Sequence, residues 1–194
     1  VVGLTIETRP DAISVQTLYD ARRWGVTRIQ IGVQHTNQAI LDLLNRGCTL
    51  EDATEATSMM MDFGFKVVYH WMPDLPGSSP EIDEAMFRRI LLPTHDSNQQ
   101  PTWDLLGDEW KIYPFSVLPW SVCETWEKEG KYQSYGTDRL IDVLIYAKRL
   151  IKQVDASSIR IVRLIRDIPV PYIIGGNKVA HLRQVIEKKL QHIK

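Results

Sequence analysis

Residues 28–47, RIQIGVQHTNQAILDLLNRG, contain one strand and one helix joined by a short turn. Apolar residues alternate with polar or small ones over residues 28–33, which is the period of a β-strand with one buried face. An amphipathic helix follows, and we expect Thr36 to cap its start and Gly47 to end it. A strand followed at once by a helix is the unit from which parallel sheets are built.

The same unit recurs along the chain, which predicts an α/β fold with a parallel sheet. Strands are expected at residues 1–8, 28–33, 65–71, 110–115 and 158–165. Helices are expected at residues 14–25, 36–47, 49–64, 80–91, 137–154 and 178–193. Residues 92–104, LPTHDSNQQPTWD, are polar and flanked by proline, so they are predicted to form a surface loop.

Composition indicates one ordinary globular domain over residues 1–194, with 44% hydrophobic and 24% charged residues. No run approaches the roughly 20 apolar residues of a membrane span, and the N-terminal segment has no signal-peptide pattern, so we expect no membrane partner and a cytoplasmic location. Residues 146–194 carry eleven Lys and Arg against three Asp and Glu. This basic segment on an otherwise acidic chain indicates either a polyanion partner or a solvated face.

Three of the predicted strands place polar side chains at or near their carboxyl ends: Glu7, Gln34 and His70. Proteins of the α/β class bind ligands at that edge of the sheet. We therefore predict a shared interior site, lined also by Arg46, which closes the following helix. The alternatives are core polar groups that satisfy one another, or solvent-facing residues of an edge strand.

Two further features each allow two interpretations. The segment MPDLPGSSP, residues 72–80, either offers backbone donors to an anion at a helix N-terminus or simply caps that helix. Trp110, Trp120 and Trp126 either stack on a nucleotide base or pack in the core. His35 and His70, and the distant thiols Cys48 and Cys123, lack the spacing of a metal motif, so no metal site is expected.

Several longer strings resemble a known family. They are GLTIETRPD, GVTRIQIGVQHTNQAILDLLNRGC, GFKVVYHWMPDLPGSSP, WKIYPFSVLPWS, EGKYQSY and RIVRLIRDIPVPYIIGGN. In this order they resemble the radical-SAM domain of the Elongator catalytic-subunit family, whose members modify the wobble uridine of tRNA. The resemblance covers nearly the whole chain apart from residues 92–104.

The resemblance implies the later part of a partial (β/α) barrel of radical-SAM type. It places Glu7, Gln34 and Arg46 at S-adenosylmethionine contacts, whereas His70 falls where related enzymes often carry an acidic residue. It also implies a transferase that generates a deoxyadenosyl radical with a [4Fe-4S] cluster. That radical takes hydrogen from the acetyl group of acetyl-CoA, and the product is a uridine carboxymethylated at C5.

The chain departs from the family in two respects. It has no cysteine triplet for a [4Fe-4S] cluster, so the cluster ligands are expected upstream of Val1, and no acetyltransferase domain follows residues 173–177. We therefore expect a fragment or a shortened homologue that is inactive alone. The alternatives are a non-catalytic tRNA-binding or scaffold module, and an unrelated barrel-type metabolic enzyme with Glu7 or His70 as general base.

The resemblance also implies tRNA as a partner, together with the other Elongator subunits if the source is eukaryotic, where a nuclear pool is expected beside the cytoplasmic one. The basic segment independently offers charge for phosphates. The residues predicted to contact tRNA are Lys111, Tyr113, Arg160, Arg163 and Arg166. The arginines recur every third residue, and with the basic residues of the helix at 137–154 they would form a continuous positive surface if strand and helix pack side by side.

Overall fold

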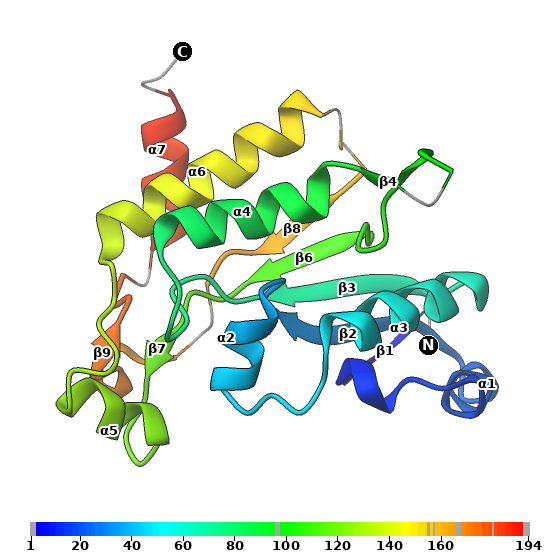
Figure 1. Cartoon of the computed structure of the whole chain (residues 1–194), viewed down its shortest axis with the longest axis horizontal. Coiled ribbons are helices and arrows are strands. Elements are labelled where there is room, and N and C mark those ends of the chain that lie inside the picture. Colours follow the sequence, from blue (N-terminus) through cyan, green and yellow to red (C-terminus); the bar gives the residue numbers. More distant parts are fainter. Residues whose placement is uncertain are drawn as a thin grey trace.

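A five-stranded parallel sheet forms the centre of the molecule (Figure 1). The computed structural model describes residues 3–95, 98–154, 156, 158–165, 168–179 and 181–191. The sheet order is β1-β2-β3-β6-β8, and all four neighbouring pairs are parallel. Its strands are β1 (Leu4–Thr8), β2 (Val26–Gln34), β3 (Lys66–Trp71), β6 (Glu109–Ile112) and β8 (Arg160–Arg163). The parallel α/β architecture predicted from the sequence is confirmed.

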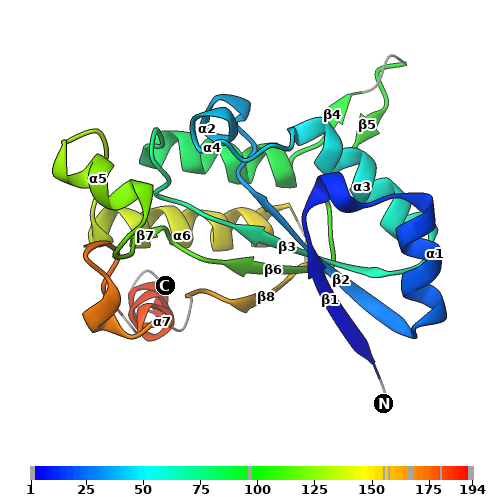
Figure 2. The same ribbon diagram turned by 90° about the horizontal axis from the view of Figure 1, so that it is seen from below.

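Helices connect the strands and cover one side of the sheet; Figure 2 shows α3 and α4 on that side, and α6 packs beside α4. The helices are α1 (Val15–Arg23), α2 (Gln38–Leu43), α3 (Leu50–Asp62), α4 (Pro80–Leu91), α5 (Val122–Lys128), α6 (Thr137–Gln153) and α7 (Leu182–Gln191). A parallel sheet with helices along one side and an open other side is the arrangement expected for part of a barrel wall. None of the described helices is both long and apolar enough to cross a membrane.

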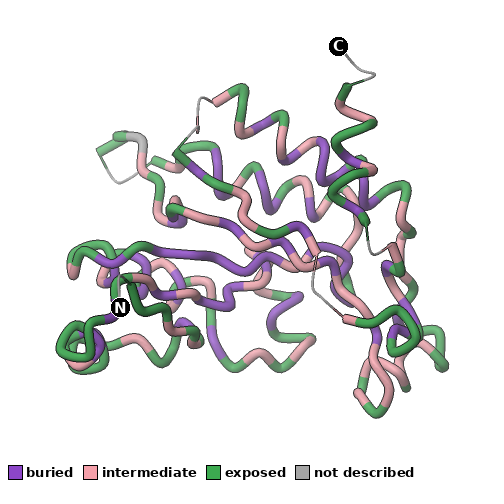
Figure 3. The backbone as a smooth tube through the Cα atoms, turned by 180° about the vertical axis from the view of Figure 1, so that it is seen from behind, coloured by how far each residue is buried: buried purple, intermediate pink, exposed green. Residues whose placement is uncertain are grey.

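The core lies between the sheet and the helices, as the burial colours of Figure 3 show for the central strands. At every second position of the central strands an apolar side chain points toward the helices. These residues are Ile29, Ile31, Val67, Tyr69, Trp71, Trp110 and Ile112. The helices contribute residues such as Met60, Phe87 and Leu144 to the same cluster. The polar residues between them in sequence, including Gln30, His70 and Lys111, therefore face the open side of the sheet.

Short elements escaped prediction because they are too brief to show a period. Within the predicted loop, β4 (Thr94–His95) pairs with β5 (Pro101–Thr102), and further along β7 (Ser116–Val117) pairs with β9 (Gly175–Gly176). The helical turns η1 (Pro10–Ala12) and η2 (Val170–Tyr172) were also missed. Helix α5 was missed because it has no buried residue. It approaches β9 so closely that a Cβ at Gly175 would lie 1.8 Å from Oε1 of Glu127.

Two details of the helix predictions, the cap of α2 and the start of α7, were wrong. Asn37, not Thr36, caps α2, since its side chain accepts a hydrogen bond from the amide of Ala39. Helix α1 buries Leu18 and Ala21, whereas its other apolar side chains are exposed because this helix covers only the end of the sheet. Helix α7 also begins four residues later than expected, at Leu182.

Candidate functional site

The carboxyl ends of β1, β2 and β3 surround a cavity of about 430 Å³. All four residues predicted for a cofactor site line it: Glu7, Gln34, Arg46 and His70. Gly32, Thr8, Arg9 and Ala12 complete the lining. The structure therefore brings together side chains that lie up to 63 positions apart in the sequence.

Gln34 ends β2 in an unusual backbone conformation. Its φ is +73°, in the left-handed region that residues other than glycine rarely adopt. The pairing of β2 with β3 shifts between Ile31 and Gln34, and the Gln34 carbonyl accepts a hydrogen bond of 2.8 Å from the amide of Met72. This break turns the strand out of the sheet at the cavity. Strained backbone of this kind is concentrated at functional sites.

Arg46 reaches back from the end of α2 to the strand. Its Nη2 donates a 2.8 Å hydrogen bond to the Gly32 carbonyl, and a Cβ at position 32 would lie 2.7 Å from that nitrogen. Glycine at 32 is thus required for the guanidinium to lie here. The Nε of Arg46 is buried and has no hydrogen-bond partner among the described residues. A buried donor without a partner favours a ligand that brings an acceptor.

His70 and Glu7 form the other side of the cavity. His70 is 8% exposed; its Nδ1 lies 3.5 Å from Oε1 of Glu7 and its Nε2 lies 3.0 Å from Oε1 of Gln30. The Tyr113 ring contacts the imidazole edge-on at a centroid distance of 5.3 Å. The Glu7 side chain is 62% exposed, so its carboxylate stands at the opening while the imidazole lies inside.

A buried carboxylate, Asp83 of α4, holds the segments that surround these strand ends. It accepts hydrogen bonds from His35 Nε2 at 3.1 Å, Ser78 Oγ at 2.5 Å, the Asp74 amide at 2.7 Å and the Tyr135 hydroxyl at 2.6 Å. These donors come from the loops after β2 and β3 and from the segment before α6. The first turn of α4 therefore already holds an internal anion.

The role of residues 72–80 follows from that arrangement. Ser79 caps α4 by accepting a hydrogen bond from the amide of Ile82, and Ser78 binds Asp83. Of the two alternatives for this segment, the structure favours the capped helix start over an external anion site.

Asp74 is the second buried carboxylate of this network. It is 2% exposed and accepts hydrogen bonds from Ser134 Oγ at 2.5 Å and from the Tyr135 amide at 3.2 Å. Burial raises the pKa of Asp74 to about 6, and the nearby charge of Asp83 acts in the same direction. The folded chain therefore disfavours the ionised form of Asp74.

A second cavity, of about 340 Å³, lies on the open side of the sheet. Arg28, Lys111, Arg160 and Arg163 line it, together with Gln30, Glu109, Val68 and Val162. Arg28 forms an ion pair of 3.4 Å with Glu109, and Lys111 donates a hydrogen bond to Gln30. Three residues predicted to contact tRNA thus lie together, whereas Arg166 lies outside the described residues.

Arg160 and Arg163 share this cavity only because the pairing of β6 with β8 is irregular. Residues three apart on a regular strand face opposite sides. Arg160 pairs with Glu109 and Arg163 with Lys111, with a register shift between Trp110 and Lys111. Tyr113, also predicted to contact tRNA, lies outside this cavity: it packs on His70 and lines a third cavity, of about 240 Å³, with Phe115 and Cys123.

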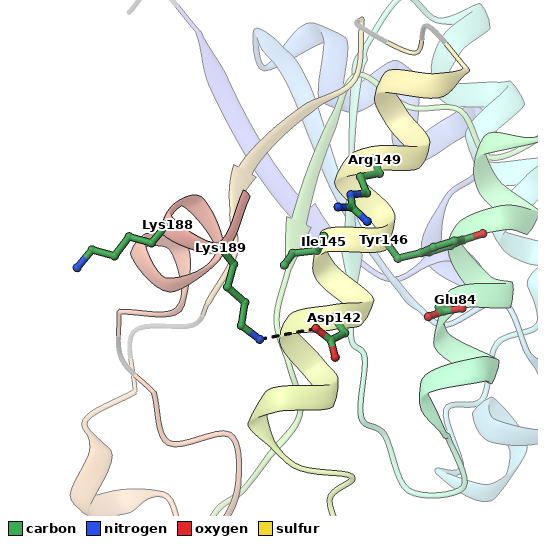
Figure 4. A pocket seen from close by; sticks show the side chains of 7 residues that line it. All are labelled: Glu84, Asp142, Ile145, Tyr146, Arg149, Lys188 and Lys189. Carbon is green, nitrogen blue, oxygen red and sulfur yellow. Dashed lines mark ion pairs between the residues drawn. The ribbon is translucent and has the colours of Figure 1, made fainter. Parts of the chain in front are cut away.

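Three other basic residues of the C-terminal segment, Arg149, Lys188 and Lys189, line a different cavity on the helix side. Figure 4 shows a cavity of about 720 Å³ among α4, α6 and α7, where Lys189 forms an ion pair of 3.7 Å with Asp142. Its lining residues are Glu84, Asp142, Ile145, Tyr146, Arg149, Lys188 and Lys189. None of these seven residues lines the basic cavity that holds Arg160 and Arg163.

Arg28 and Gln30 line the basic cavity but were not predicted as site residues. Their alternation with the buried Ile29 and Ile31 indicates that they face the open side of the sheet, and this pattern could have identified them. Sequence reasoning also left the tryptophans open. Trp110 is fully buried in the core, whereas Trp120 is almost fully exposed.

The cysteines do not resemble iron ligands. The [4Fe-4S] cluster needs three cysteine thiolates, whereas the sequence has two cysteines, Cys48 and Cys123, and burial raises the pKa of both. Within the described ranges, no three His, Cys, Asp or Glu side chains are grouped so that they could hold a metal ion.

Comparison with protein families identifies two matching regions. Residues 1–90 match the family described as the radical SAM superfamily, and residues 107–192 match the family described as the radical SAM C-terminal domain.

Curated proteins match over almost the whole chain. The tRNA uridine(34) acetyltransferase of Dehalococcoides mccartyi is 37% identical over 98% of this chain and 39% of its own length. Elongator complex protein 3 of Saccharomyces cerevisiae is 35% identical over 99% of this chain and 32% of its own length. The chain thus spans about a third to two fifths of the length of these relatives.

Solved structures show the same fold. Elp3 of the archaeon Methanocaldococcus infernus superposes with a TM-score of 0.88 at 35% identity, over 99% of this chain and 42% of that one. Coproporphyrinogen III oxidase of Escherichia coli superposes with a TM-score of 0.59 at 20% identity, over 78% of this chain and 32% of that one.

We expect Asp83→Ala to lower the free energy of unfolding by at least about 3 kcal/mol, because it leaves several buried donors without an acceptor. Urea denaturation followed by circular dichroism measures this change. Glu84→Ala, at the next position of α4, is the control, since it removes only a half-exposed carboxylate 3.9 Å from Arg88 and should cost no more than about 1 kcal/mol. Equal effects of the two variants would contradict the role of Asp83.

The raised pKa of Asp74 predicts a pH-dependent stability. Between about pH 4 and pH 6 the folded chain binds more protons at Asp74 than the unfolded chain does, so this group lowers stability as the pH rises, by roughly 2–3 kcal/mol in total. Asp74→Asn cannot ionise. The free energy of unfolding of both proteins is measured at pH 4.5 and at pH 7. From the lower to the higher pH, the variant should lose less stability, or gain more, than the parent protein. Equal changes in the two proteins would refute the prediction.

Proposed function

The chain belongs to the radical SAM superfamily, and from this premise we propose that it is part of a transferase that modifies the wobble uridine of tRNA. The names of its curated relatives support this substrate, and the fold they share with this chain supports the chemistry. We propose carboxymethylation at C5 of uridine as the overall reaction, with S-adenosylmethionine, a [4Fe-4S] cluster and acetyl-CoA as its requirements.

The observation that carries the proposal is the convergence of Glu7, Gln34, Arg46 and His70 on one cavity. S-adenosylmethionine has a carboxylate, an ammonium group and hydroxyl groups, so its site needs both donors and acceptors. Arg46 offers a buried donor, Glu7 offers acceptors, the His70 ring offers a donor or an acceptor according to its tautomer, and the Gln34 amide offers both. The residues of the cavity therefore fit the cofactor.

When bound and cleaved, S-adenosylmethionine supplies the carbon radical that starts the reaction. The residues of this chain bind and orient it. Arg46, held against the Gly32 carbonyl, fixes the donor side of the cavity, and His70, held by Gln30, lies beside Glu7 on the other side. The described residues do not fit the cluster, because they offer two cysteines rather than three and no group of three possible metal ligands, so we assign its ligands and the acetyl-CoA site to other parts of the whole protein.

We propose that the tRNA contacts the open side of the sheet. Lys111, Arg160 and Arg163 line one cavity there, and Arg28 adds a further cation, although Glu109 partly offsets it. Tyr113, beside His70, offers a ring for stacking next to the cofactor cavity. In a eukaryote the partners would be the other Elongator subunits, in the cytosol and with a nuclear pool.

One alternative keeps a specific observation in its favour. A non-catalytic tRNA-binding or scaffold module would need the basic cavity but no cluster ligands. The described residues form the basic cavity and contain no group of three possible metal ligands. The cavity lined by four cofactor-type residues favours the catalytic proposal over it. The unrelated metabolic enzyme has no support, because the chain matches radical SAM families along most of its length.

We expect Glu7→Gln and Gln34→Asn to weaken S-adenosylmethionine binding by about tenfold each, because each removes or displaces a polar partner of the ligand. Asparagine is chosen at position 34 because it tolerates the positive φ there better than alanine does. Isothermal titration calorimetry on the full-length protein measures the effect. Gln16→Asn on the exposed face of α1 is the control, and unchanged affinity in both site variants would remove the cofactor assignment.

Phosphate contacts on the open side should make tRNA binding depend on salt. Each contact adds roughly 0.7–0.9 to the slope of log affinity against log salt. We expect Arg160→Gln with Arg163→Gln to weaken binding and to flatten the slope by roughly one to two units, as measured by filter binding from about 50 to 200 mM salt. Lys188→Gln with Lys189→Gln removes the same charge from the helix side. An equal effect of this control pair would show that the site on the open side is not specific.

A further inference from the structure

We propose that Lys111 and Gln30 are positioning residues that fix the tautomer of His70, so that its Nδ1 faces the cofactor cavity as a hydrogen-bond acceptor. The part of this inference that concerns the ligand rests on the proposed cofactor site. The part that concerns the tautomer rests on the geometry of three side chains on neighbouring strands.

The chain of contacts begins at Lys111. Its ammonium group can only donate hydrogen bonds, and it contacts Oε1 of Gln30. An amide whose oxygen and nitrogen were exchanged would place an NH2 group against the ammonium. Lys111 therefore determines which end of the Gln30 amide faces the neighbouring side chains.

The same oxygen determines the hydrogen position on His70. Nε2 of His70 lies 3.0 Å from Oε1 of Gln30, and an oxygen that can only accept requires that Nε2 carries the hydrogen. In the neutral ring Nδ1 is then the acceptor. The Tyr113 ring, in edge contact at 5.3 Å, limits rotation of the imidazole.

The tautomer decides what the cavity presents to a ligand. Nδ1 lies 3.5 Å from Oε1 of Glu7. With hydrogen on Nε2, both of these atoms are acceptors, and they converge on a ligand group that donates, such as an ammonium or a hydroxyl. With hydrogen on Nδ1, His70 would instead donate to Glu7, and the two side chains would satisfy each other.

Gln30 and Lys111 line the basic cavity and are absent from the lining of the cofactor cavity, whereas His70 lines the latter. The hydrogen-bonded chain from Lys111 through Gln30 to His70 thus links two cavities on the open side of the sheet. A substitution in the basic cavity should therefore alter an acceptor in the cofactor cavity.

Nitrogen-15 NMR of the His70 ring tests the tautomer directly, with the His70 signals identified by their loss in His70→Gln. We expect hydrogen on Nε2 in the parent protein. Gln30→Leu should shift the ring toward the Nδ1–H form paired with Glu7, and Lys111→Met should give a mixture because the amide can then turn. Lys111→Arg keeps a donor and should preserve the parent signals.

Calorimetry with S-adenosylmethionine supplies the second readout. Gln30→Leu should weaken binding by about tenfold and Lys111→Met by less, whereas Gln16→Leu on α1 should change neither the tautomer nor the affinity. Circular dichroism verifies that each variant is folded.

An Nδ1–H ring in the parent, or an unchanged tautomer in both Gln30→Leu and Lys111→Met, overturns the inference. If the tautomers follow the prediction while the parent protein does not bind S-adenosylmethionine, the positioning role stands and the proposed cofactor is wrong.

Discussion

The buried carboxylate of Asp83 is the constraint on which the rest of the site depends. A charge removed from water is tolerated only where hydrogen bonds replace the lost hydration. Asp83 receives four, from His35, Ser78, Tyr135 and the Asp74 amide. Because these donors belong to different connections of the sheet, the carboxylate joins the loops after two central strands to the start of two helices. His35, which binds Asp83, directly follows Gln34, which lines the cavity. The hydrogen bond to Asp83 therefore fixes the position of this strand end.

The sheet divides the molecule into two sides with different chemistry. The helix side is apolar at the strands, where Tyr69, Trp71 and Trp110 are fully buried. The open side carries Gln30, His70 and Lys111 at alternate positions of adjacent strands, and the side chains bind one another across the strands. This arrangement gives the open side a fixed set of donors and acceptors, which the proposed transferase needs in order to orient a cofactor and a polyanion on the same surface.

The alternation of residues predicted much of this arrangement. The placement of Glu7, Gln34 and His70 at strand ends, with apolar partners on the opposite face, predicted a shared interior, and the cavity is lined by all three. The role of Asp83 was not predicted. The true partners of Asp83 lie between 5 and 52 positions away in the sequence, and no local pattern records them. The basic residues of the C-terminal segment were expected to form one surface if strand and helix pack side by side; in the structure Arg160 and Arg163 line one cavity, whereas Arg149 lines another.

The sequence by itself determined the parallel α/β class, the order of the main strands and helices, and which strand residues face away from the core, because period and capping are local properties of the chain. Only the tertiary structure decided that Arg160 and Arg163 face the same cavity, since a register shift between β6 and β8 overrides the two-residue period. It also decided which hydrogen bonds bind Gln30, His70 and Lys111 together. Such contacts depend on the spacing of strands that are distant in sequence, and that spacing is set by the packing of the whole sheet against its helices.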